Sequence, residues 1–512
     1  MRTSTSTSLV AGLMIGHASM GLAAEGDPLS AIDWLSDSIT LPEEVPPATE
    51  PEPVTPLSEI SVSPLDQPVP DRAGLVDALD LGVQPGLWGR SSAAELAQMI
   101  AQLPEAQDAP PSLRRFLHDL MVARLDPPVD AASDQSLYLA RLDKLLAMGH
   151  LGAANDLIKA AGVPEPQRFR RAFDIALLTG TESEACRVIE QTPDISPTYP
   201  ARVFCLARNG KWDVAALTLG NAEALGILTP EEDKLLLIFL DAELFENEPV
   251  PRPPRVPSPL MFRLYEAIGE RIPTDQLPVA FAVADLSDTV GWQARLRAIE
   301  RLAAAGAVSA DQLIEVYSER RPAASGGIWD RVAAVRALVD ALETGDAARV
   351  TQTLPKAWAH AKSAGYDAGL AYWAAPRLDE IALNGVARHE AFEIALLAWE
   401  PALARQFVGA SAEDRFLLAL AEGAGGAEPG NDPLSRAVLR GLAALEPNPR
   451  HKALLEDGRA GEAVLLAYAM LSDGAAGNPA GVADALALLR ALGLETLARQ
   501  VAVELVLKEG AA

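Results

Sequence analysis

The chain has 512 residues, a formal net charge of −27 and a hydrophobic content of 49%. This length and hydrophobic content allow two or three folded domains, or one long repeat array. A strongly acidic surface repels phosphate backbones, so the sequence predicts no binding to nucleic acid.

Residues 1–24 have the layout of a signal peptide. Arg2 precedes a short apolar stretch, and the small residues at 21–24 offer a cleavage site. The apolar stretch is too short to span a membrane, and no later stretch reaches 18 uninterrupted apolar residues. We therefore expect an exported, periplasmic protein, or one that is secreted further, without a membrane span.

A short amphipathic helix is expected at 25–41, before a disordered, Pro- and Glu-rich linker at 42–72. The apolar residues of the helix share one face: Leu29, Ile32, Leu35 and Ile39, with Trp34 beside them. Residues 42–70 contain nine prolines, several acidic residues and no basic residue, which predicts an extended segment. Trp34 and Leu35 are candidate partner-binding residues. The helix could dock on another protein, fold back onto its own chain, or have no role.

From about residue 91 onward, amphipathic helical patterns alternate with short turns, which predicts an all-α fold. Capping boxes are expected at Ser92–Glu95, Thr181–Glu184 and Ser309–Gln312, and Thr229 should begin a helix with Pro230 in its first position. Proline-rich and glycine-rich stretches suggest the boundaries. The expected units are N-terminal repeats at 73–246, a Pro-rich loop at 247–259, middle repeats at 260–421, a Gly-rich loop at 422–433 and C-terminal repeats at 434–512.

A glycine recurs between helices at a regular spacing. Gly149, Gly180 and Gly210 lie 31 and 30 residues apart, in "LLAMGHLGAANDLI", "LLTGTESEACRVI" and "LARNGKWDVAALTL". Looser copies occur at 341–350, 454–466 and 489–502. Glycine permits the left-handed conformation that ends a helix, so each position predicts a helix–turn–helix hairpin.

These hairpins resemble the tetratricopeptide repeat in a degenerate form, although its usual unit is 34 residues. The resemblance implies an α-solenoid of antiparallel helical hairpins, a fold whose members hold peptides or protein partners. The composition is also similar to the superhelical part of soluble lytic transglycosylases, but the last 80 residues lack the expected E-S-x-F context of the catalytic glutamate. A further similarity, through "PGLWGRSSAAELAQMI" (85–100), is to secreted, proline-linked helical proteins of Gram-negative bacteria.

The only two cysteines, Cys186 and Cys205, lie at matching heights on two expected helices joined by the turn "TPDISP". Export permits a disulfide between them. The alternative is two buried free thiols, which behave as small hydrophobic side chains.

No motif predicts catalysis or a cofactor. The six histidines form no HExxH motif, no G-x-S-x-G elbow occurs, and the glycines at 423–430 lack the Lys and Ser/Thr of a phosphate loop. We therefore expect no catalytic, cofactor-binding or metal-binding residues.

An aromatic cluster offers a second candidate partner surface: Trp358, Tyr366, Tyr372 and Trp373. Packing in a helical core is the alternative. The sequence predicts a non-enzymatic scaffold or adaptor of the bacterial envelope that binds protein or peptide partners. Its alternatives are a structural or secreted factor without a specific partner, and a cell-wall-associated enzyme.

Overall fold

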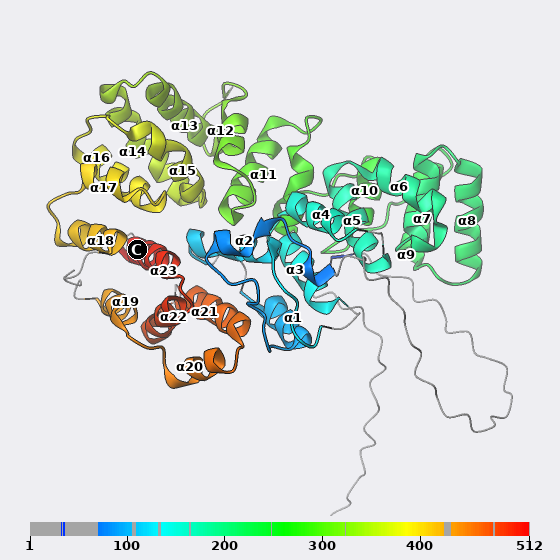
Figure 1. The fold of residues 1–512 in the computed structure, drawn as a ribbon. Helices are drawn as coiled ribbons and strands as arrows, with labels where there is room; N and C mark the ends of the chain where they lie inside the picture. The colour runs from blue at the N-terminus through cyan, green and yellow to red at the C-terminus, as the bar shows by residue number, and fades with distance from the viewer. Residues whose placement is uncertain are drawn as a thin grey trace, which may run out of the picture.

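The computed structural model describes residues 32, 34–35, 70–104, 109–131, 135–162, 165–246, 248–322, 324–423, 432–474 and 477–510 (Figure 1). Within these ranges the chain is almost entirely helical, which confirms the predicted all-α class. The expected signal peptide and Gly-rich loop lie mainly outside the described residues. None of the described helices is both long enough and apolar enough to span a bilayer.

The helices of the first half are α1 (Ala93–Gln102), α2 (Pro111–Val122), α3 (Ser136–Ala147), α4 (Leu151–Ala160), α5 (Pro166–Thr179), α6 (Glu182–Gln191), α7 (Tyr199–Arg208), α8 (Trp212–Ala224), α9 (Pro230–Leu240) and α10 (Pro259–Ala267). Short 3-10 helices are η1 (Pro70–Arg72), η2 (Ala78–Leu81), η4 (Pro193–Ile195), η5 (Thr274–Gln276) and η6 (Val279–Leu286). Two strands of two residues each, β1 (Val76–Asp77) and β2 (Ala123–Arg124), pair in parallel.

The helices of the second half are α11 (Trp292–Ala305), α12 (Ala310–Ser318), α13 (Ile328–Glu343), α14 (Ala347–Ala364), α15 (Asp367–Leu378), α16 (Gly385–Leu397), α17 (Pro401–Phe407), α18 (Ala412–Glu422), α19 (Pro433–Ala443), α20 (Pro449–Glu456), α21 (Ala460–Gly474), α22 (Pro479–Ala491) and α23 (Glu495–Gly510).

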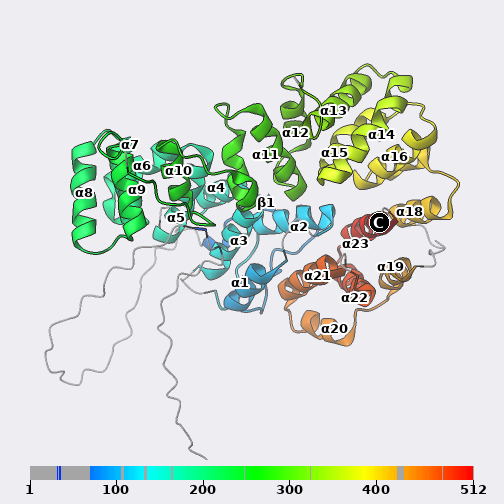
Figure 2. The same ribbon diagram turned by 180° about the vertical axis from the view of Figure 1, so that it is seen from behind.

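Two parts of the molecule have separate apolar cores. Helices α5–α10 extend to one side as an arm, with α8 at its outer end (Figures 1 and 2). The core of this arm lies between Phe169 and Tyr265. The main core joins α1–α4 to α11–α23. Both cores cross the expected unit boundaries, since Leu260 and Tyr265 follow the Pro-rich loop yet pack with α5–α9.

The predicted glycine turns are confirmed. Six glycines between consecutive helices have φ angles from 62° to 84°, in the left-handed region: Gly149, Gly180, Gly210, Gly345, Gly458 and Gly493. Their backbone N–H groups bond to carbonyls of the preceding helix, which ends that helix and lets the next one reverse direction.

Two of the predicted capping boxes are wrong. Ser309–Gln312 forms both bonds of the box, as does Thr229–Glu232, but Ser92 and Thr181 make no side-chain cap. At α1, Asp130 accepts a hydrogen bond from the first N–H (2.9 Å). At α6, the Thr181 hydroxyl bonds to Thr179 instead (2.9 Å). At α1 a more distant carboxylate thus takes the place of the Ser92 cap, and at α6 the Thr181 hydroxyl is engaged with Thr179 and does not cap the helix.

The expected linker at 42–72 includes three residues that belong to the folded body. Residues 70–72 form η1, and Asp71 is buried. Fully buried Arg141 of α3 donates hydrogen bonds to the carbonyls of Asp71 (3.1 Å), Ala73 (3.0 Å), Met121 (2.8 Å) and Ala123 (2.8 Å). A buried guanidinium needs such acceptors, and carbonyls before β1 and at the start of β2 supply them.

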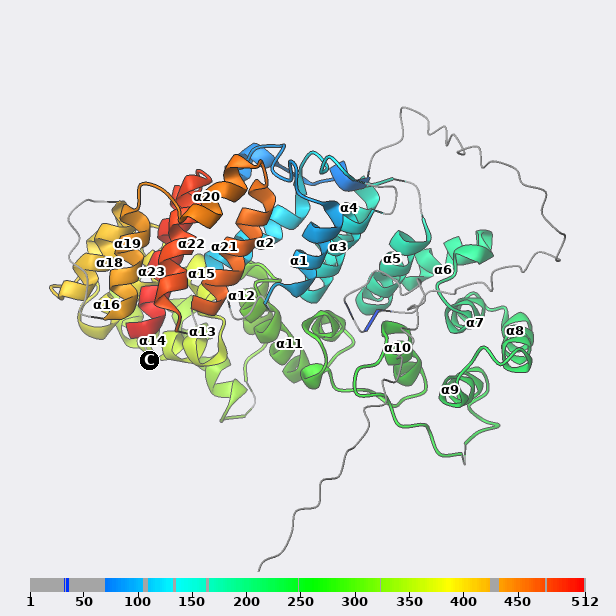
Figure 3. The ribbon, with the colours of Figure 1, turned by 90° about the horizontal axis from the view of Figure 1, so that it is seen from below.

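The last helix packs against the beginning of the chain. Ser112, at the start of α2, donates its N–H to both carboxylate oxygens of Glu504 (3.0 Å each) and its hydroxyl to one of them (2.8 Å). Figure 3 shows α21 beside α1 in the same region. A linear repeat array, in which each unit contacts only its neighbours, does not predict this contact.

A second contact between the two ends requires a glycine. Trp88 is fully buried against α21, where a Cβ atom at Gly461 would lie 2.5 Å from the indole ring. The N–H of Arg90 donates to the carbonyl of Gly458 (3.0 Å). Both ends of the chain therefore share one core.

The Glu504 carboxyl gives this contact a pH dependence. Burial raises its pKa to about 7, while hydrogen bonds from Ser112 and the charges of Arg114 and Arg115 act in the opposite direction. Because the folded pKa lies above that of the unfolded chain, the protonated carboxyl stabilises the fold at low pH. This stabilisation is lost as the pH rises through about 7.

We predict that Glu504→Gln removes this pH dependence, because the amide does not titrate. Between about pH 4 and pH 8, the free energy of unfolding of the variant should rise relative to the wild type by on the order of 3 kcal/mol. Urea unfolding at a series of pH values measures the difference. Parallel pH profiles for the two proteins would contradict the assignment.

Candidate functional site

The N-terminal segment docks on its own chain. Trp34 and Leu35 are only 4% and 6% exposed, and the Leu35 N–H donates to the carbonyl of Ile32 (3.3 Å), which closes a turn. The Trp34 ring meets the edge of Phe281 in η6, with ring centroids 5.5 Å apart. The remainder of the expected helix, including Leu29 and Ile39, lies outside the described residues.

The pocket for Trp34 lies where the arm meets the main core. Phe281 also meets Phe262 of α10 at 5.5 Å, and Ile175 and Leu178 of α5 belong to the same core cluster. Aromatic pairs with this edge-to-face geometry add stabilisation beyond the burial of their surface. Ring contacts therefore run from Trp34 through Phe281 of η6 to Phe262 of α10.

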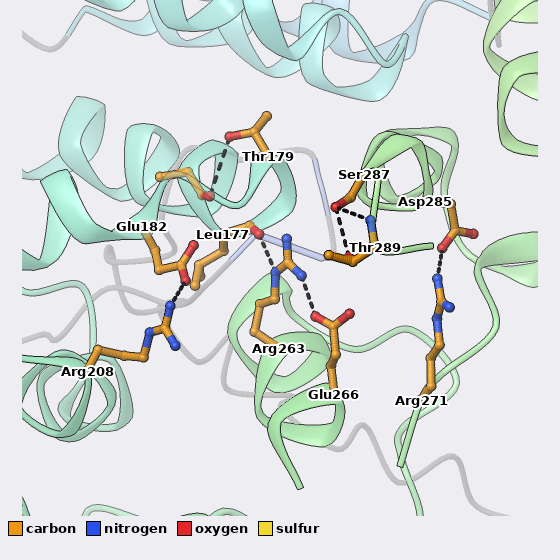
Figure 4. A network of polar contacts seen from close by, with 11 residues as sticks. Leu177, Thr179, Glu182, Arg208, Arg263, Glu266, Arg271, Asp285, Ser287 and Thr289 are labelled. Atoms are coloured by element: carbon orange, nitrogen blue, oxygen red, sulfur yellow. Dashed lines mark hydrogen bonds and ion pairs between the residues drawn. The ribbon is translucent and has the colours of Figure 1, made fainter. Parts of the chain in front are cut away.

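Polar contacts join α10 and the segment after it to α5 and η6 (Figure 4). Arg263 of α10 donates to the carbonyl of Leu177 at the end of α5 and pairs with Glu266. After α10, Arg271 forms an ion pair with Oδ1 of Asp285, whose Oδ2 atom accepts a hydrogen bond from the Thr274 hydroxyl. These contacts link α5, α10 and η6 around the Trp34 pocket without contributing apolar surface.

The second candidate partner surface is mostly core. Trp358, Tyr366 and Trp373 are 0%, 1% and 5% exposed, so these three rings present almost no surface to a partner. Tyr372 is partly exposed, and the Arg115 guanidinium stacks over its ring at 4.1 Å. Tyr372 lines a cavity between α2 and α15, and Trp358 lines a smaller cavity between α2, α14 and α23.

An apolar surface that the sequence did not single out lies on α8 and the turn after it. Its large side chains are 44–68% exposed: Trp212, Val214, Leu217, Leu225 and Ile227. The opposite side of α8 packs through Ala215, Leu219 and Ala222. Large apolar side chains therefore stand on the exposed side of the helix, beside Asp213 and Glu223, and this mixture was the available signal.

The two cysteines form a disulfide that joins α6 to α7, with Cα atoms 4.9 Å apart. Both residues are buried in the core of the arm. Their sequence separation is 19 residues, and closing a loop of this length restricts the unfolded chain.

We predict that Cys186→Ala/Cys205→Ala destabilises the arm by about 3 kcal/mol. Hydrogen exchange across a urea series measures this, because peptides from the arm report separately from peptides of α19–α23. The midpoint for α19–α23 should stay unchanged and serves as the internal control. An unchanged midpoint in the arm would contradict the prediction.

We also predict that Trp34→Ala uncovers Phe281. Amides of α10 and η6 should exchange about tenfold faster, because the docked ring excludes water from them. Hydrogen-exchange mass spectrometry of peptides from 259–286 measures the change. Trp212→Ala, which removes a half-exposed ring from the arm, is the control and should leave these amides protected. Equal protection in wild type and Trp34→Ala would show that the segment does not cover this site.

Titratable groups do not gather into a metal site in the described ranges, where no three His, Cys, Asp or Glu side chains are placed to hold an ion. His118 and His150 lie with ring centroids 4.2 Å apart. Burial, together with His118, lowers the pKa of His150 to about 3, so this imidazole is neutral at physiological pH.

Comparison with known proteins gives no match: no family model matches the chain, and neither does a curated protein or a solved structure.

Proposed function

We propose that this protein is an exported, non-enzymatic scaffold or adaptor of the bacterial envelope, and that it binds a protein partner through α8. The observation that supports this most directly is the exposed apolar surface of α8 and the turn after it, which has five large hydrophobic side chains within sixteen residues. Val214 and Leu217 lie on one side of α8, whereas the half-exposed Trp212 ring also packs against Phe239 (ring centroids 6.1 Å apart). Exposed apolar surface is typical of protein–protein contact sites. The signal layout of residues 1–24 and the Cys186–Cys205 disulfide support an oxidising compartment such as the periplasm.

The proposal includes an α-solenoid arrangement for the arm. Gly180 and Gly210 close the hairpins α5–α6 and α7–α8, and consecutive helices from α5 to α10 pack on one another. A terminal helix of such a stack has a neighbour on one side only, which leaves its outer face free for a partner. The proposed resemblance of the arm to tetratricopeptide repeats is based on these hairpins and on the spacing of their glycines.

The chemistry of α8 specifies a helical partner. Ala216, Gly220 and Ala224 recur every four residues, so another helix can approach the backbone closely. Leu217 and Val214 provide apolar contacts beside them, while Asp213 and Glu223 add negative charge. The complementary surface is an amphipathic helix with an apolar stripe and basic flanking residues.

We predict that a photo-crosslinking residue at Leu217 of the full-length chain captures one partner of defined mass in the cells that produce it. Leu445 is the matched control, because it is a fully exposed leucine outside the arm. The crosslinked product should form from position 217 and not from position 445. Leu217→Glu, with the crosslinking residue moved to Leu225, should abolish the product, because a buried carboxylate opposes docking.

Two outcomes would contradict the proposal. Equal labelling from positions 217 and 445 would indicate random collision, which is the result expected of a structural or secreted factor without a specific partner. A product containing only a second copy of the chain would indicate that α8 is a contact between identical subunits.

A further inference from the structure

A cavity of about 580 Å³ lies beside α2, on the side of the main core that faces α11, α12 and α15. Its wall is formed by the first half of α2, by His150 after α3, by the turn from α11 to α12 and by the start of α15. This volume lies within the range of small-molecule sites. The turn contributes only small or apolar residues from Ala303 to Val308, which leaves room for a ligand.

The ionisable side chains of the cavity wall are basic, apart from Tyr372. Arg114 and Arg115 are adjacent in α2, His118 lies one turn later, and His150 lies next to His118. No carboxylate lines this cavity among the described residues, although the chain as a whole carries a charge of −27. Local positive charge on an acidic protein favours an anionic ligand at this place.

The two arginines suit such a ligand in different ways. Arg115 stacks on Tyr372 and forms no hydrogen bond or ion pair within the described ranges, so its stacked guanidinium has free N–H groups along its edge. Arg114 is 8% exposed and donates to the carbonyl of Ala304, but its Nε atom has no partner within the same ranges. The Arg114 Nε atom is too buried to touch a ligand, but the charge of this guanidinium still acts on the cavity that Arg114 lines.

The nearest acidic groups do not occupy the cavity. Glu504 and Asp367 lie beyond Arg114, where they line a smaller cavity of about 330 Å³ between α2, α14 and α23. Burial raises the pKa of both carboxyls, so they are less fully ionised and neutralise less of the positive charge of Arg114. Asp119 accepts a hydrogen bond from His118 or pairs with its charged form (2.9 Å) and is absent from the wall.

We propose that the cavity between α2, the α11–α12 turn and α15 binds a small molecule that carries an oxyanion, a carboxylate or a phosphate, beside an apolar body. The Arg115 guanidinium contacts the oxyanion, Arg114 adds positive charge to the wall beside it, and Tyr372 holds Arg115 in place by stacking. Ala307 and Val308 contact the apolar body. The site is separate from the α8 face and does not depend on the role proposed for that face.

Isothermal titration calorimetry of the full-length chain tests the site with two probes, inorganic phosphate and benzoate. At least one probe should bind saturably. Arg115→Gln should weaken that binding by about tenfold, since it removes a charged hydrogen-bond donor. Arg320→Gln is the control, because Arg320 is 65% exposed and distant from the cavity wall, and its affinity should match the wild type.

The outcomes separate the two ligand classes. Binding of phosphate alone identifies a phosphate-bearing ligand, and binding of benzoate alone identifies a carboxylate with an apolar body. Absence of saturable binding for both probes would overturn the proposal. So would an equal loss of affinity in Arg115→Gln and Arg320→Gln, because it would indicate general attraction by surface charge.

Discussion

The contact of α2 with the last helix closes the main part of the fold into one core. Ser112 and Glu504 meet although 392 residues separate them, and Trp88 packs against Gly461 in the same region. Closing so long a loop costs conformational entropy, although this cost grows only slowly with loop length. Shared burial offsets it, because one continuous apolar core extends from α1–α4 through α11–α23. The helices between the ends are thereby held around α2 and α23.

This closure separates the proposed ligand site from the proposed partner-binding surface. The seam between α2, α14, α15 and α23 contains the two cavities, and the basic first half of α2 contributes to both walls. The arm lies outside the closed part, so α8 has packed neighbours on one side and an uncovered apolar face on the other. Trp34 and Leu35 lie at the junction, where Phe262 of the arm meets Phe281. Ligand binding at the seam and partner binding on the arm can therefore occur independently.

Local chemistry explains which features could be predicted from the sequence. The turns at Gly149 and Gly210 depend on a few neighbouring residues, so glycine spacing located them. Cys186 and Cys205 flank one short turn, which allowed either a disulfide or two buried thiols. The contact of Ser112 with Glu504 could not be predicted, because helical periodicity does not identify which distant helices meet. The exposed side of α8 could not be predicted for the same reason. Apolar residues occur on both sides of this helix, and only its position at the end of the arm leaves Val214 and Leu217 exposed. Arg115 and His150 became neighbours of one cavity only through this tertiary packing.

The closure of the chain is tested most directly by a distance measurement between its two ends. Spin labels at Glu95 of α1 and Arg459, before α21, replace two side chains that form an ion pair at 3.7 Å. The native cysteines are bonded to each other and do not take up the label. Electron paramagnetic resonance should detect one short and narrow distance between the labels. A long or broad distribution would mean that the ends are apart, and the shared core and the cavities at the seam would then not exist as described.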